Sequence, residues 1–135
     1  MLATSHGQQI VLHEGIVMRT SGALVFLLLA GSQAEACRVP FIRTLDNQTV
    51  SGTMTAQSGK PCSIVLRTTL GPMLSAHIVE RPTNGSASLG AGNRVIYRSR
   101  PGYTGTDSFA YARTGTNRHN EKVVRTVRIA VQVRP

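Results

Sequence analysis

The sequence predicts an all-β protein, an antiparallel β-sandwich of about seven strands that follows a cleavable signal peptide. Three observations lead to this prediction. An apolar run with a cleavage pattern lies near the N-terminus, short runs of alternating apolar and polar residues fill the rest of the chain, and turn-forming residues separate those runs. The chain has 135 residues, a length that fits one domain plus an accessory segment.

The N-terminal third contains a segment typical of secretion signals. After a basic start, an apolar run covers residues 23–30, and Ala34 and Ala36 occupy the positions that a signal peptidase reads. We therefore expect a signal peptide over residues 18–36. Cleavage before Cys37 would leave a secreted or periplasmic protein with no membrane span in its mature form.

Two other interpretations of this segment fit less well. As a helix the apolar run would span only about 12 Å, compared with about 30 Å of membrane hydrocarbon, so it is too short for a stable anchor. Glu35 breaks the small-residue pattern that precedes a lipid-modified cysteine, so simple cleavage is favoured over lipid attachment at Cys37.

Residues 1–17 precede the signal without a basic cluster or a clear periodicity. We interpret them as an over-called N-terminal extension, with Met18 as the initiator, and the alternative is a long first region of the signal peptide. The mature domain then covers residues 37–135, with 14 basic and 4 acidic residues and a formal net charge of +10. Such a balance favours anionic partners and says nothing about the fold.

Both cysteines, Cys37 and Cys62, belong to the mature domain. A pair of cysteines in an exported domain allows one intramolecular disulfide, and the alternative is a reactive or metal-binding thiol pair. No His or acidic residue lies at a ligand spacing from either cysteine, so we predict a structural disulfide.

The mature domain consists of short runs with a period of two, which is the signal of a half-buried strand. In chain order, the residues expected to face the core are Cys62, Ile64 and Leu66; Leu74, Ala76 and Ile78; Val95 and Tyr97; Phe109 and Tyr111; and Val127, Ile129, Val131 and Val133. Two weaker runs, at 49–55 and 85–90, bring the number of strands to about seven. Turns at a spacing of about 8 to 12 residues indicate a sandwich of immunoglobulin type.

The segments GKPCSIVL, AHIVERPTNGSASL and RVIYRSRPGYTGTDSFAYA follow one another in the chain. In this order they resemble one repeat of the bacterial immunoglobulin-like, cadherin-like families of surface proteins. The resemblance covers residues 49–133, and GYTGTDSFAYA is its most specific part. The positions that match the family signature are Pro82, Gly85, Tyr97, Tyr103, Gly105, Asp107, Phe109 and Tyr111. Relatives are commonly strung in tandem, whereas this chain has a single unit.

Physical chemistry gives the signature segment a structural role. A turn at 101–102 precedes Gly105, which provides a backbone position for positive φ, and Asp107 can accept hydrogen bonds from nearby backbone amides. Phe109 and Tyr111 then bury large rings on the core face. We therefore expect Asp107 to be architectural rather than catalytic or metal-binding.

No catalytic residue, cofactor or metal site is predicted. His77 and His119 lack a serine on a strand-turn-helix elbow, so no hydrolase triad is indicated. Calcium needs about six to eight oxygen ligands, several of them carboxylate. The mature acidic residues are scattered in the sequence: Asp46, Glu80, Asp107 and Glu121.

Arginine is the one abundant residue that the fold does not explain. Candidate polyanion-binding residues fall in two groups: Arg94, Arg98 and Arg100, and Arg113, Arg125 and Arg128. They are either ordinary solvated strand faces or a surface for anionic polymers. Arg125 falls on an apolar register, so we expect it at the start of its strand or paired with Glu80 or Glu121.

These observations favour a secreted or periplasmic, non-enzymatic module with a structural, adhesion or binding role at the bacterial cell envelope. Its partner would be an anionic envelope polymer or another envelope protein. The alternative is a polyanion-binding protein, for acidic polysaccharide, lipopolysaccharide or nucleic acid, that acts through its arginines. Nucleic acid is the least favoured of these partners because an export signal is present and no nucleic-acid-binding motif is found.

Overall fold

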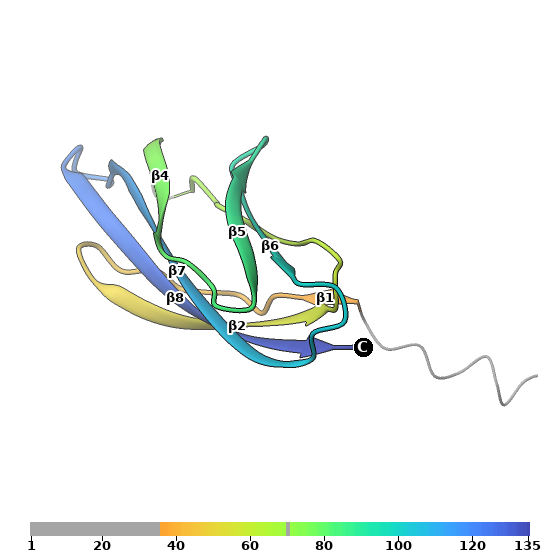
Figure 1. The fold of residues 1–135 in the computed structure, drawn as a ribbon. Helices are drawn as coiled ribbons and strands as arrows, with labels where there is room; N and C mark the ends of the chain where they lie inside the picture. Colours follow the sequence, from red (N-terminus) through yellow and green to blue (C-terminus); the bar gives the residue numbers. More distant parts are fainter. Residues whose placement is uncertain (1–35, 70) are drawn as a thin grey trace, which may run out of the picture. The chain divides into compact units, whose positions relative to one another are not determined.

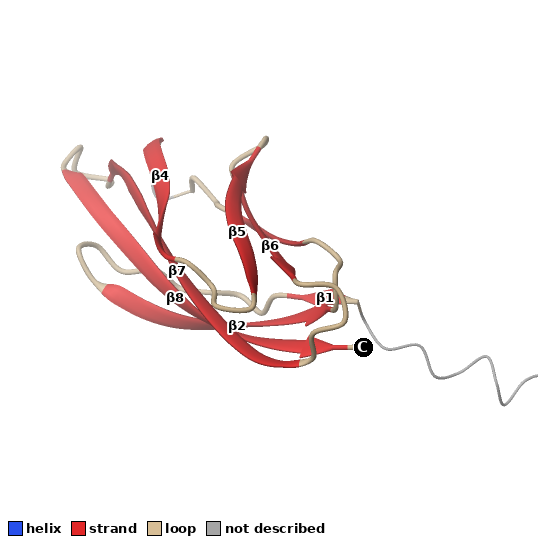
Figure 2. Cartoon of the chain, viewed as in Figure 1, coloured by secondary structure: helices blue, strands red, loops and turns tan. Residues whose placement is uncertain are grey.

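The computed structural model describes residues 36–69 and 71–135, and all regular structure in these ranges is β-strand (Figures 1 and 2). The predicted all-β class is therefore confirmed. The expected N-terminal extension and nearly all of the expected signal peptide lie outside the described residues. The part of the chain that is described contains no helix with the length and hydropathy needed to cross a membrane.

Within the described residues, eight strands form two sheets. In chain order the strands are β1 (Cys37–Arg38), β2 (Thr49–Gln57), β3 (Cys62–Val65), β4 (Met73–Glu80), β5 (Gly85–Gly90), β6 (Arg94–Ser99), β7 (Gly105–Thr116) and β8 (Lys122–Arg134). The larger sheet has the order β1-β2-β8-β7-β4, and the smaller sheet has the order β3-β6-β5. Figure 1 shows β5 and β6 facing the larger sheet across the core.

One ladder differs from the expected antiparallel arrangement. β2 pairs with β8 in parallel, from Thr49 opposite Thr126 to Gln57 opposite Arg134, and the other ladders are antiparallel. The chain leaves β2 for the smaller sheet and returns to β8 much later, so no tight hairpin forces the two strands into opposite directions.

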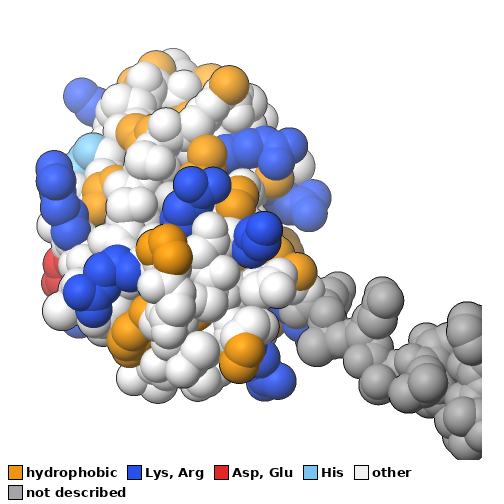
Figure 3. Space-filling model, turned by 45° about the vertical axis from the view of Figure 1, so that its right-hand side comes forward, with side chains coloured by type: hydrophobic (Ala, Val, Ile, Leu, Met, Phe, Trp, Pro, Cys, Tyr) orange, Lys and Arg blue, Asp and Glu red, His pale blue; other side chains and the backbone are white. Residues whose placement is uncertain are grey.

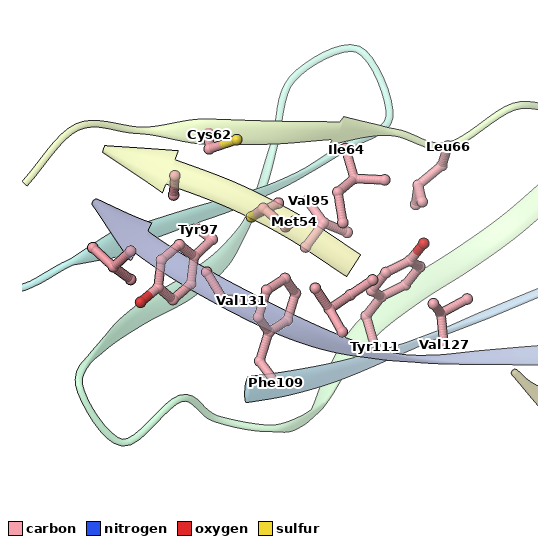
Figure 4. Close-up of a cluster of buried hydrophobic side chains, with 13 residues drawn as sticks. Met54, Cys62, Ile64, Leu66, Val95, Tyr97, Phe109, Tyr111, Val127 and Val131 are labelled. Carbon is pink, nitrogen blue, oxygen red and sulfur yellow. The ribbon is translucent and has the colours of Figure 1, made fainter. Parts of the chain in front are cut away.

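The core lies between the two sheets and follows the period-two pattern closely. Val95 and Tyr97 of β6 face Phe109 and Tyr111 of β7, and the rings of Tyr97 and Phe109 stack with their centroids 5.6 Å apart (Figure 4). The expected inward residues of β3 and β8 are buried as well. Alternation therefore identifies the core-facing side of these four strands.

The prediction is wrong for one residue of β4. Leu74 was expected in the core, but 61% of its surface is exposed, and Met73 packs against the core with Ala76 and Ile78. The pairing of β4 with β7 shifts between Met73 and Ser75. A bulge of this kind inserts an extra residue and moves the preceding side chains to the opposite face.

On the outer face of the larger sheet, an ion pair between the two strands that flank β7 passes over a small residue of β7. Ala110 lies opposite Glu80 of β4 on one side and Arg128 of β8 on the other. The Glu80 carboxylate and the Arg128 guanidinium form an ion pair at 2.7 Å, which bridges the strand between them. Ala110 is consequently buried although it faces outward, and a larger side chain would separate the pair.

Candidate functional site

The Asp107 carboxylate accepts four hydrogen bonds. They come from the backbone amides of Ser108 at 2.9 Å, Thr83 at 3.1 Å and Asn84 at 3.2 Å, and from the Tyr97 hydroxyl at 2.8 Å. The bond to Ser108 is of the local kind expected from the sequence. The other three connect β7 to the β4–β5 turn and to β6, so Asp107 joins segments from both sheets.

The signature residues around Asp107 are used in the same way. Burial and the hydrogen bond to Asp107 raise the pKa of Tyr97, which keeps its hydroxyl protonated as a donor. The Tyr103 hydroxyl donates to the Thr106 carbonyl at 2.5 Å. Pro82 is buried in the β4–β5 turn, next to the backbone amides that Asp107 binds. These contacts give the cluster a role in holding the fold.

Glycine is required at two positions of this cluster. Gly105 has a φ of +128°, as expected for a positive-φ position, and a Cβ added there would lie 3.2 Å from the Tyr103 hydroxyl oxygen. A Cβ at Gly85 would lie 2.3 Å from the Arg98 carbonyl oxygen. Since that neighbour is backbone, Gly85 cannot be replaced without moving β5 away from β6.

The six candidate polyanion-binding arginines do not share one surface. Arg94 and Arg98 are exposed on the outer face of the smaller sheet, and Arg100 is exposed beyond the end of β6, where it donates to the Asn84 side-chain oxygen at 2.9 Å. Arg128 lies on the larger sheet in its ion pair. In Figure 3, Lys and Arg side chains are spread over the visible face among apolar ones.

The remaining two candidates, Arg113 and Arg125, are buried and sit directly opposite each other in the β7–β8 ladder. The placement of these two residues on an exposed basic surface is therefore wrong. Both continue the inward register of their strands, after Tyr111 on β7 and before Val127 on β8. In the sequence, a charged residue at a core-facing position of a strand indicates a buried charge. Arg113 occupies such a position two residues after Tyr111, but it was not identified as buried from the sequence.

Arg125 is neutralised by an acidic residue that the sequence did not indicate. It is 4% exposed, and its guanidinium donates to the Asp46 carboxylate at 2.7 and 2.9 Å. The hydrogen bond from Arg125 lowers the pKa of Asp46 below its usual value. The expected partners are engaged elsewhere: Glu80 binds Arg128, and Glu121 accepts a hydrogen bond from the Asn117 side chain.

Arg113 has no carboxylate partner among the described residues. It is 9% exposed, and its guanidinium donates to the Arg67 carbonyl and, at 3.3 Å, to the Thr44 hydroxyl. Its Nε–H has no hydrogen-bond partner in the described part of the protein. Burial and the nearby charge of Arg125 lower the pKa of the Arg113 guanidinium.

A cavity of about 740 Å³ adjoins Arg113. Its walls come from three segments: residues 39–48 between β1 and β2, residues 63–69 of β3 and the following loop, and Tyr111 with Arg113 on β7. Burial raises the pKa of Tyr111 to about 12, so its hydroxyl is neutral at physiological pH. The arrangement offers a space with apolar and polar walls and one buried cation.

The predicted disulfide between Cys37 and Cys62 is present, with Cα atoms 5.4 Å apart. It joins β1 of the larger sheet to β3 of the smaller sheet. Residues 39–48, which form one wall of the cavity, lie inside the closed loop. A structural disulfide of this kind is typical of oxidising, extracytoplasmic compartments.

No group of three or more His, Cys, Asp or Glu side chains suited to a metal ion occurs in residues 36–69 and 71–135.

In comparisons with known proteins, no family model matches the sequence, and no curated protein is significantly similar to it. The fold and the sites together define a disulfide-bonded, all-β protein with two facing sheets.

Proposed function

We propose that the chain is an immunoglobulin-like, non-enzymatic module that is exported and has a structural, adhesion or binding role at the bacterial cell envelope. The observation that carries the proposal is the strand order. If β2 to β8 are taken as the successive strands of an immunoglobulin domain, the second, fifth and fourth form one sheet, and the third, sixth and seventh lie in the other. The first strand differs, because β2 pairs with β8 in the larger sheet. The grouping of the other six strands supports the resemblance seen in the sequence.

The disulfide supports the extracytoplasmic part of the proposal. Cytosolic thiols are kept reduced, whereas small exported domains use disulfides to strengthen limited cores. The Cys37–Cys62 bond also joins the two sheets at the start of the domain.

The use of the acidic residues supports a non-enzymatic role. Asp46 and Glu80 are in ion pairs, Asp107 holds the turn cluster, and Glu121 binds Asn117. A general acid or base needs a carboxylate within reach of a substrate. Each described carboxylate instead has a protein partner that the fold uses.

A second candidate function, binding to an anionic polymer, is favoured by the smaller sheet. Arg94 and Arg98 flank Ile96 on its outer face, and the sequences of β3, β5 and β6 contain no Asp or Glu. Arginine can grip carboxylate, sulfate or phosphate through two parallel hydrogen bonds. This face is therefore the best site for an acidic polysaccharide or lipopolysaccharide.

Fractionation of bacteria that express the full chain with a C-terminal tag tests the proposal. We expect the protein in the periplasmic fraction or the medium, shortened at its N-terminus, with both cysteines protected from alkylation until a reductant is added. A full-length protein in the cytoplasm with two reactive thiols would overturn the extracytoplasmic assignment. A Cys37→Ser/Cys62→Ser variant provides the alkylation control.

A further inference from the structure

We propose that the cavity beside Arg113 binds a small organic monocarboxylate with an apolar body, and that the carboxylate lies against the Arg113 guanidinium. This inference goes beyond the proposed function. It uses none of the exposed arginines of the smaller sheet, and it holds whether or not the domain binds a polymer.

The charge balance around Arg113 calls for one anion. Two guanidinium groups, those of Arg113 and Arg125, lie side by side, and only Arg125 has a carboxylate, that of Asp46. A buried, unpaired charge is costly unless a partner of opposite sign is supplied. A bound carboxylate would neutralise Arg113 and give its free Nε–H an acceptor.

A second donor lies on the same side of β7. Tyr111 and Arg113 are two residues apart on the strand, so their side chains share a face, and both line the cavity. Figure 4 shows the Tyr111 hydroxyl directed toward Ile64 and Leu66 of the opposite wall. Tyr111 lines the cavity together with Arg113, so its hydroxyl can donate to a ligand's oxygen.

The walls determine the rest of the ligand. Val39, Ile42, Ile64 and Leu66 present apolar side chains to the cavity, and its volume of about 740 Å³ is within the range of small-molecule sites. Arg113 is the one buried arginine in these walls, and it lacks a carboxylate partner within the described residues, which suits a monoanion that carries a hydrocarbon body. A phosphate monoester, which carries close to two charges at neutral pH, would leave charged oxygens against apolar surface.

Two further arginines would assist entry. Arg43 and Arg67 also line the cavity and are exposed to solvent. Their charges raise the local concentration of anions near the opening. A cationic or neutral ligand of the same shape gains neither this attraction nor the contact with Arg113.

A second copy of the chain is the main competing occupant. Phe41, in the segment that walls the cavity, is 80% exposed and could insert its ring into the cavity of another molecule. Such an insertion would leave Arg113 unpaired, whereas a carboxylate neutralises it. The charge therefore favours the small anion over the second copy.

Titration of the purified, oxidised, ¹⁵N-labelled protein with sodium octanoate, monitored by NMR, tests the proposal. We expect the Arg113 Nε–H signal and the amides of Ile64 and Leu66 to shift saturably. 1-Octanol has the same chain and a neutral head. Its affinity should be at least about tenfold lower, because it cannot form the charge-assisted hydrogen bond. Octyltrimethylammonium should leave the signals unchanged.

Any of three results would overturn the proposal. The first is that the signals of Arg113, Ile64 and Leu66 do not shift with octanoate, and the second is that the three head groups give equal shifts. The third is that inorganic phosphate competes as well as octanoate. Shifts that depend on protein concentration without octanoate, and that disappear in Phe41→Ser, would assign the cavity to a second copy instead.

Variants separate binding from folding. Arg113→Gln should weaken octanoate binding about tenfold or more, but Arg113 also holds Thr44 and the Arg67 carbonyl. Leu45→Glu leaves those contacts intact and adds a negative charge to the cavity wall, so it should weaken octanoate and spare octanol. Leu74→Glu, on β4 outside the cavity, is the matched control and should change neither. Equal effects of the two glutamates on octanoate would contradict the site.

Discussion

The hydroxyl of Tyr97 donates a hydrogen bond of 2.8 Å to Asp107, while the ring of the same tyrosine stacks on Phe109. One side chain thus connects the apolar core to the polar cluster at the β4–β5 turn. The backbone amides of Thr83 and Asn84 depend on the same carboxylate. Core packing and turn conformation are therefore coupled through Asp107.

The first prediction concerns this carboxylate. Asp107→Asn replaces one acceptor oxygen by a donor NH₂, so at least one of the amides or the Tyr97 hydroxyl loses its partner. We expect the free energy of unfolding to fall by about 1.5–3 kcal/mol, and Tyr97→Phe, which removes only one hydrogen bond, should cost about 1 kcal/mol. Urea unfolding followed by circular dichroism measures both. Additive effects in the double variant would show that the two residues are not coupled.

The second prediction tests which faces of the strands form the core. Phe109 is fully buried against Tyr97, so Phe109→Ala should lower the free energy of unfolding by about 3–5 kcal/mol. Arg98 lies on the exposed side of β6, and Arg98→Ala should change it by about 0.5 kcal/mol or less. Thermal unfolding of the two variants compares them, and similar shifts would contradict the assigned faces.

The strands could be predicted because half-buried sheets impose a period of two on the sequence. Val127, Ile129, Val131 and Val133 are all buried as that period requires. Leu74 breaks the pattern because a bulge at the start of β4 depends on pairing with β7, which the local sequence does not encode. The parallel pairing of β2 with β8 is likewise set by tertiary contacts.

The polar sites were less predictable, for a related reason. Arg125 was recognised as unusual on an apolar register, but its partner Asp46 is 79 residues away in the chain. Asp46 belongs to a segment without regular structure, so no periodicity indicates where its side chain lies. The same segment forms one wall of the cavity. Arg113, on a regular strand, is therefore the part of the cavity that the sequence pattern could have indicated.

The third prediction concerns acid stability. Arg125 lowers the pKa of Asp46 below its usual 3.8 in the folded protein. As the pH falls, Asp46 takes up a proton at a higher pH in the unfolded chain than in the folded protein. The ion pair therefore stabilises the fold above the usual pKa of 3.8, and this stabilisation is lost as the pH falls through the lower pKa of the folded state. Asp46→Asn should be less stable than the wild type at neutral pH and should lose less stability between about pH 5 and 2. Unfolding by urea across that range measures the difference.

Glu80→Gln is the matched control for the acid-stability measurement. It removes the carboxylate of the exposed ion pair with Arg128, and exposed pairs contribute only about 0–1 kcal/mol. We expect its stability at neutral pH to stay close to that of the wild type. If Glu80→Gln and Asp46→Asn were equally destabilising, the buried environment of Arg125 would not be the cause.

The fourth prediction concerns the disulfide. Breaking the Cys37–Cys62 bond releases a loop with a sequence separation of 25, and loss of that constraint on the unfolded chain should lower the free energy of unfolding by about 3–4 kcal/mol. Chemical unfolding with and without reductant measures the effect. The Cys37→Ser/Cys62→Ser variant should match the reduced protein and should be insensitive to reductant.

The last prediction separates a binding surface from a general charge effect. The exposed arginines of the smaller sheet, with Arg100 beside them, should hold the protein on a heparin-like resin. Raising the salt from about 50 to 500 mM shortens the Debye length from roughly 14 to 4 Å, so elution should depend steeply on salt.

Replacing Arg94, Arg98 and Arg100 by Gln should lower the salt needed for elution. The matched control replaces Arg38, Arg81 and Arg118 by Gln, an equal change of charge at exposed positions in β1, after β4 and in the β7–β8 turn. We expect the first triple variant to elute clearly earlier than the second, because clustered charge focuses the potential on an anionic partner. Identical elution of the two would reduce the effect to net charge and leave the structural or adhesive role as the better account of the domain.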